Sequence, residues 1–157
     1  MRMVSVGMIK LSLIMHYNIF RFAYSAIRRW DRSANHAKLL KDESRWSQCV
    51  YTYLLAIYIN ADESYSSEER HEVVTMLMQK IPQVRMRIAG KSIPVEKYCE
   101  RKAKRFLQYG KLYYPHYEFM YFFNIFTILE PHPTPLINDI LKDIEDHWEK
   151  SPSSKYL

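Results

Sequence analysis

The residues that could do chemistry are scattered along this chain, and two local patterns match known catalytic or binding motifs only in part. Gly90-Lys91-Ser92 matches the end of a phosphate-binding loop, but the glycine that this motif needs five residues earlier is Arg85. His71-Glu72 begins a zinc-protease pattern, but the second histidine of that pattern would fall at Thr75. The sequence therefore predicts neither a phosphate-binding loop nor a zinc site at these positions.

The remaining candidates for catalysis lack a local signature. Cys49 and Cys99 have no partner at metal-binding or redox spacing, and we expect both to be reduced and buried. The other histidines fall on different expected helices, so no nucleophile and base stand close together in the sequence. We therefore predict no enzyme activity, no metal and no cofactor.

The elements that carry these residues are expected to be helices. Only three of the 157 residues are glycine, which argues against a sheet protein built on many tight turns. Since 48% of the residues are hydrophobic, we expect residues 1–150 to form one all-α domain, followed by a flexible tail over residues 151–157. No apolar run is long enough to cross a membrane and no cleavable leader is recognisable, so we expect a cytoplasmic location.

A short pattern recurs in the first third of the chain. Arg-Trp pairs occur at residues 29–30 and 45–46, sixteen residues apart and each time where a helical pattern begins, which is typical of repeats built from two helices. From Trp46 onward, Cys49, Val50 and Tyr53 fall at the offsets of the first-helix signature of a tetratricopeptide repeat. The aromatic residues that we expect in the core of the repeats are Trp30, Trp46, Tyr53, Phe106, Phe119 and Trp148.

Hydrophobic periodicity predicts about seven antiparallel helices, arranged as pairs in a tetratricopeptide-like solenoid. Ser44 is expected to cap the start of the third helix, and Ser66 with Glu69 forms a capping-box pattern before the fourth. Pro82 should kink or end the fourth helix, and Pro94 should open the fifth. The expected helices cover about residues 4–27, 31–41, 47–59, 67–85, 94–109, 115–126 and 137–148.

Several motifs occur in an order that is typical of one family. They are Ser44-Arg45-Trp46-Ser47, Arg87 to Pro94, Arg101-Lys102-Ala103 and Glu118-Phe119-Met120-Tyr121. With these motifs, residues 16–148 resemble the C-terminal part of the tetratricopeptide repeat protein 39 family, which includes the fungal inclusion-body clearance proteins. Family members differ in being several hundred residues long and in usually carrying a tryptophan near Phe122-Phe123. The resemblance implies the C-terminal end of a longer solenoid, a scaffold for other proteins, and a link to lipid homeostasis.

The fifth expected helix is strongly amphipathic. Tyr98 and Phe106 lie on its apolar side, and four basic residues lie on the other side. We interpret this basic side as a solvated helix face, with contact to an acidic protein or an anionic lipid surface as the alternative. No nucleic acid is expected, because single-strand binders place their aromatic and basic side chains on one shared surface. The four basic residues are Lys97, Arg101, Lys104 and Arg105.

Three functional hypotheses from different classes follow. The first is a non-catalytic helical-repeat scaffold for protein–protein interaction, and the second is a helical module associated with a lipid or membrane surface. The third and weakest is an enzyme whose site residues meet only in the folded chain. The first helix adds a further expectation, because residues from Val4 to Ile27 are apolar on more than one side and should favour self-association.

Trp46 opens the best-matching repeat helix, and we expect its indole to pack near Leu39 and Leu40. Trp46→Ala should therefore lower the free energy of unfolding by about 3–5 kcal/mol, as aromatic truncation in a core does. Denaturant or thermal unfolding measures the change. An unaltered melting temperature would show instead that the indole is exposed to solvent.

Overall fold

The computed structural model describes residues 2–44, 47–88, 90–129 and 135–150, and within these ranges the chain is all-α apart from one short hairpin. The chain divides into two compact units, residues 1–116 and 117–157. The predicted single domain over residues 1–150 stays a prediction. The first unit holds α1 (Arg2–Ala26), α2 (Trp30–Glu43), α3 (Gln48–Ala61), α4 (Ser67–Lys80), η1 (Ile81–Gln83), β1 (Arg87–Ile88), β2 (Lys91–Ser92) and α5 (Pro94–Tyr109). The remaining helices are α6 (Pro115–Phe122), α7 (Ile125–Leu129) and α8 (Pro135–Lys150).

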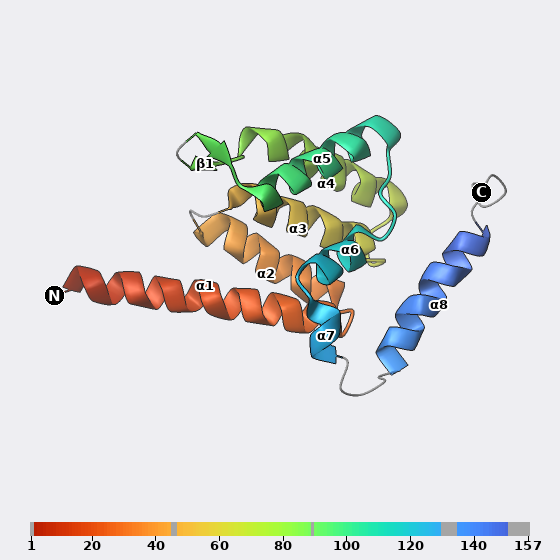
Figure 1. Cartoon of the computed structure of the whole chain (residues 1–157), viewed down its shortest axis with the longest axis horizontal. Coiled ribbons are helices and arrows are strands. Elements are labelled where there is room, and N and C mark those ends of the chain that lie inside the picture. Colours follow the sequence, from red (N-terminus) through yellow and green to blue (C-terminus); the bar gives the residue numbers. More distant parts are fainter. Residues whose placement is uncertain (1, 45–46, 89, 130–134, 151–157) are drawn as a thin grey trace. The chain divides into compact units, whose positions relative to one another are not determined.

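Helices of the first unit stack in chain order, and consecutive helices run in opposite directions (Figure 1). α1 packs on α2, α2 packs on α3, and α3 also contacts α4 and α5. This arrangement confirms the predicted helix-pair solenoid. The described residues contain eight helices, one more than expected, because the sixth expected helix is divided into α6 and α7.

The sixth expected helix is divided at Asn124. This residue takes the left-handed conformation, with φ of 56°, and its N–H donates to the carbonyl oxygen of Tyr121 at 2.9 Å. Asparagine adopts this conformation more readily than most residues, so it ends α6 and lets α7 begin at Ile125. The expectation of one continuous helix over residues 115–126 is therefore wrong.

α3 is the central helix of the first unit. Ten of its 14 residues are buried, so no side of the helix is left to water. Apolar or aromatic residues fill nearly every position of α3 from Cys49 to Ile59. A helix that is apolar all round has to be covered by neighbours on every side, and α2, α4 and α5 supply that cover.

The link between α2 and α3 differs from the prediction. Ser44 does not cap the start of α3, since it is the C-cap of α2 and its N–H donates to the carbonyl oxygen of Leu40 at 2.9 Å. α2 runs to Glu43, which places Ser44 at the end of that helix instead. The side chain of Gln48 then donates to the carbonyl oxygens of Lys41 (2.7 Å) and Ser44, which gives partners to the free end of α2.

Other local signals act as predicted. Ser66 and Glu69 form both hydrogen bonds of a capping box at the start of α4. Pro82 follows the last turn of α4 and lies in the 3-10 turn η1, and Pro94 occupies the first turn of α5. Between them, β1 and β2 pair as a two-residue antiparallel hairpin, with Gly90 at φ of 75° in the turn.

A ring cluster joins the start of α2 to the end of the first unit. The indole of Trp30 lies 4.6 Å from the imidazole of His116 and 6.1 Å from the ring of Tyr58, measured between centroids. The His116 side chain is buried. Burial, helped by the positive charge of Arg28, lowers the pKa of His116 to about 3, so the ring is neutral at physiological pH.

The lowered pKa of His116 predicts that stability falls with acidity. The imidazole of a histidine in the unfolded chain has a pKa of about 6.5. Below that pH the unfolded chain binds a proton at this residue, whereas the folded chain does not. The free energy of unfolding should drop by about 2 kcal/mol between pH 7 and pH 5 on account of this residue. His116→Phe keeps a ring against Trp30 and should remove this part of the loss in denaturant titrations at both pH values. A variant with the same pH dependence as the parent chain would contradict the assignment.

Candidate functional site

A buried polar network fixes how α1 sits on its neighbours. Arg21 is 2% exposed, and its Nη1 donates to the hydroxyl oxygen of Tyr58 on α3 at 3.3 Å. Ser25 donates to the same oxygen at 2.9 Å, and Nη2 of Arg21 donates to Asn18 at 3.2 Å. Because these bonds require one face of α1 to point inward, they also determine which face points outward.

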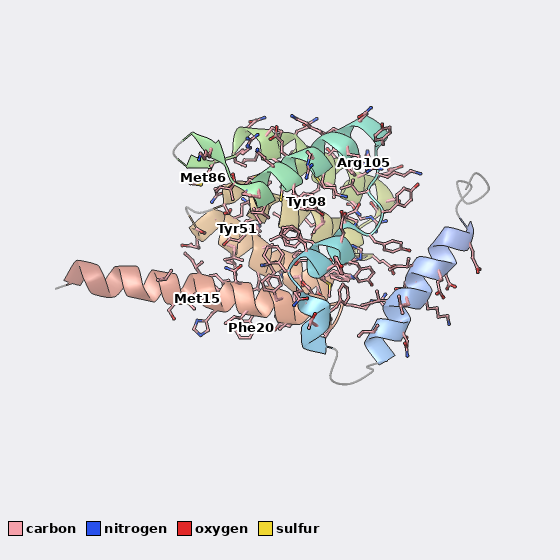
Figure 2. All side chains as sticks on the ribbon, viewed as in Figure 1. Met15, Phe20, Tyr51, Met86, Tyr98 and Arg105 are labelled. Atoms are coloured by element: carbon pink, nitrogen blue, oxygen red, sulfur yellow. The ribbon has the colours of Figure 1, made fainter. Side chains whose placement is uncertain are left out.

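The outward face of α1 is apolar. Leu11, Met15 and Ile19 follow one another at intervals of four residues, and they are 60%, 59% and 62% exposed. Residues four apart on a helix lie in one row. Figure 2 labels Met15 on α1, in the middle of this row. Residues 11–20 contain no Lys, Arg, Asp or Glu, so this row is both exposed and uncharged.

A shallow groove of about 430 Å³ continues this face toward α2. The ring of His36, from α2, stacks with the rings of Phe20 and Tyr24 at centroid distances of 5.7 and 5.4 Å. Burial, and to a smaller extent Arg32, lowers the pKa of His36, which favours a neutral ring. The groove therefore extends the uncharged character of the α1 face. Its lining residues are Ser12, Leu13, His16, Tyr17, Phe20 and His36.

The basic side of α5 faces solvent, as the amphipathic pattern of the sequence predicts. Lys97, Arg101, Lys104 and Arg105 are all exposed. Nζ of Lys104 lies 2.8 Å from a carboxylate oxygen of Glu100, which also pairs with Arg85, and both partners hold the pKa of Glu100 below its usual value. The exposed position is observed, whereas a role of these side chains in binding stays a prediction.

The aromatic residues predicted for the repeat core differ in how far they are buried. Tyr53, Phe106 and Phe119 are buried, at 0%, 3% and 1% exposure. Trp30 is only half-buried, although its ring contacts Tyr58 and His116. Trp46 and the side chain of Trp148 lie outside the described residues, so the packing predicted for them stays a prediction.

The two cysteines are free and buried, as expected, but they are not isolated from each other. The thiol of Cys49 donates to the backbone carbonyl of Glu96 at 3.7 Å, and Cys49 is close enough to Cys99 to affect the pKa of its thiol. Burial, with these neighbours, raises the pKa of the Cys99 thiol, which keeps it protonated and a poor nucleophile. Sequence spacing missed this cluster because α3 and α5 meet only in the fold. Both thiols are buried, and the Cys99 thiol is protonated, so we interpret this cluster as part of the core between α3 and α5.

Three further findings concern metal binding, the phosphate-loop motif and membrane crossing. No group of three or more His, Cys, Asp or Glu side chains among them could hold a metal ion. Lys91 and Ser92 form β2 of the hairpin, which agrees with the sequence-based rejection of a phosphate-binding loop. Within the same part of the chain, no helix has both the length and the apolar character needed for a membrane crossing.

Comparisons with known proteins point to one family. The model of the family described as Iml2/Tetratricopeptide repeat protein 39 matches residues 10–156. Tetratricopeptide repeat protein ttc-39B of Caenorhabditis elegans is 49% identical over 133 residues, which is 85% of this chain and 23% of that protein. The chain thus spans about a quarter of the length of this relative. No solved structure matches the chain.

Proposed function

We propose, because this chain belongs to the Iml2/tetratricopeptide repeat protein 39 family, that it is a non-catalytic scaffold which works by binding other proteins. Helix-pair repeats of this type build extended surfaces whose usual ligands are other proteins. We also propose a cytoplasmic location, as expected from the sequence, and a connection to lipid homeostasis, which rests on the family resemblance alone. The exposed apolar row on α1 is the observation that carries the scaffold proposal.

This row has the properties of a helix-docking surface. Leu11, Met15 and Ile19 are each about three-fifths exposed, although burying one such side chain would gain about 1.5–3 kcal/mol. Anchors at intervals of four residues match the apolar face of an amphipathic helix laid along α1. Because residues 11–20 are uncharged, the row favours an apolar partner face over an acidic or a basic one.

The occupant that we propose is an α-helix with a matching apolar face. In a solution of this chain alone, that helix is α1 of a second copy, because every copy carries the same uncharged row. A symmetric dimer of this kind uses the same surface on both chains. Self-association is therefore the form of the scaffold activity that can be tested without knowing another partner.

We expect the chain to dimerise at micromolar concentrations and Met15→Gln to weaken the dimer. The dissociation constant should rise by roughly tenfold or more, because a symmetric interface loses the side chain twice. Light scattering or sedimentation over a concentration series measures it. Met76→Gln is a matched control, because Met76 on α4 is exposed to the same extent, 59%. A chain that stays monomeric, or equal effects of the two substitutions, would count against the proposal.

A second candidate function is binding to an anionic lipid surface, and the observation that favours it is the basic side of α5. Lys97 and Arg101 are exposed, so they can meet a charged surface without unfolding the helix. Basic residues near an anionic leaflet contribute about 1 kcal/mol each to membrane binding.

For this second function, we expect the chain to float with vesicles that contain anionic lipid and to stay behind with neutral vesicles. Lys97→Glu together with Arg101→Glu should abolish flotation and leave the melting temperature unchanged, since exposed charges contribute little to folding. Equal binding to neutral and anionic vesicles would contradict an electrostatic role for α5.

A further inference from the structure

A small cavity lies at the C-terminal end of α5, apart from the α1 surface. Its volume is about 330 Å³. Lys102, Arg105 and Tyr109 are three and then four residues apart, so they line it from one side of α5, and Figure 2 shows Arg105 near this end of the helix. The segment just after the helix supplies the rest of the lining, namely Lys111, Leu112 and Tyr113.

Gly110 creates this cavity by turning the chain. It takes φ of 74°, a left-handed conformation that favours glycine, and its N–H donates to the carbonyl oxygen of Phe106 at 2.7 Å. The helix ends there, and the next three residues come to lie beside its last turns. The fifth helix expected from the sequence covers residues 94–109, in agreement with this end, but the sequence does not indicate that Lys111 shares a cavity with Arg105.

The lining of the cavity is basic and aromatic. Three of its six residues are cationic, two are tyrosines, and none is acidic. The ammonium group of Lys111 lies 5.1 Å from the centroid of the Tyr113 ring, which holds that charge at the wall of the cavity. Arg105 and Lys111 form no ion pair with any residue in the described ranges. Cations gathered in this way repel one another and favour an anionic ligand.

We propose that this cavity binds a phosphomonoester group. A guanidinium such as that of Arg105 can bind two phosphate oxygens at once, lysine ammonium groups bind them as point charges, and tyrosine hydroxyls donate further hydrogen bonds. The end of α5 carries about half a negative charge, which three full positive charges outweigh. The volume is at the lower end of the range for small-molecule sites, so the ligand is a small ester or a head group.

Two sources supply the same group, a soluble phosphate ester and the head group of phosphatidic acid. The site is independent of the α1 surface, so a chain that fails to self-associate still tests it. Glycerol 3-phosphate is the soluble probe, with glycerol as the uncharged comparison. Vesicles of phosphatidylcholine with and without phosphatidic acid are the lipid probe.

The decisive variants remove two charges from the cavity or two charges from other helices. Arg105→Gln with Lys111→Gln removes two lining cations, whereas Lys38→Gln on α2 with Lys80→Gln on α4 removes two exposed cations that do not line the cavity. All four side chains are exposed, so folding should be retained, and circular dichroism checks this. The net charge of the two double variants is identical.

Calorimetric titration of the full chain should give saturable binding of glycerol 3-phosphate and none of glycerol. The cavity pair should weaken this binding by at least about tenfold, and the control pair by less than about twofold. Vesicle binding that needs phosphatidic acid and is lost in the cavity pair would assign the lipid source, and its absence would assign the soluble ester. A parent chain that does not bind glycerol 3-phosphate, or equal losses in the two pairs, would overturn the proposal.

Discussion

The need to cover α3 on every side is the constraint on which the rest of the structure depends. With ten of its 14 residues buried, this helix cannot lie at a surface. Its neighbours α2, α4 and α5 each pack one apolar side against it. The outward sides of these helices carry no such requirement, so their composition differs from helix to helix. On α5 that outward side is basic, whereas α1, one layer further out, leaves an apolar row in water.

What α1 exposes follows from what it buries. Arg21 and Ser25 both bond to the hydroxyl of Tyr58, a residue of α3, so the rotation of α1 is tied to the core. A polar network of this kind tolerates few alternative orientations, because a buried donor that loses its partner is destabilising by about 1–3 kcal/mol. The scaffold proposal thus rests on a surface whose orientation is set from inside the molecule. The cavity at Gly110 is set by a local turn and is independent of it.

Signals that act within a few residues could be predicted from the sequence, and those that depend on distant contacts could not. The capping box at Ser66, the helix break at Pro82 and the burial of Tyr53 need only local chemistry or periodicity. Ser44 ends α2 and does not begin α3, because α2 runs to Glu43 and the backbone N–H of Ser44 bonds to Leu40. The groove at His36 joins α1 and α2, whose proximity the pattern does not encode, and the cavity at Lys111 depends on the direction that the chain takes after Gly110.

The central claim is that the uncharged row on α1 binds a helix with a matching apolar face. A photo-crosslinking side chain placed at Ile19, the last residue of the row, tests this directly when the products are mapped by mass spectrometry. The account predicts crosslinks between two chains that join position 19 to residues of α1, and few from the same probe placed at Met76 on α4. Products confined to a single chain, or equal crosslinking from both positions, would contradict it.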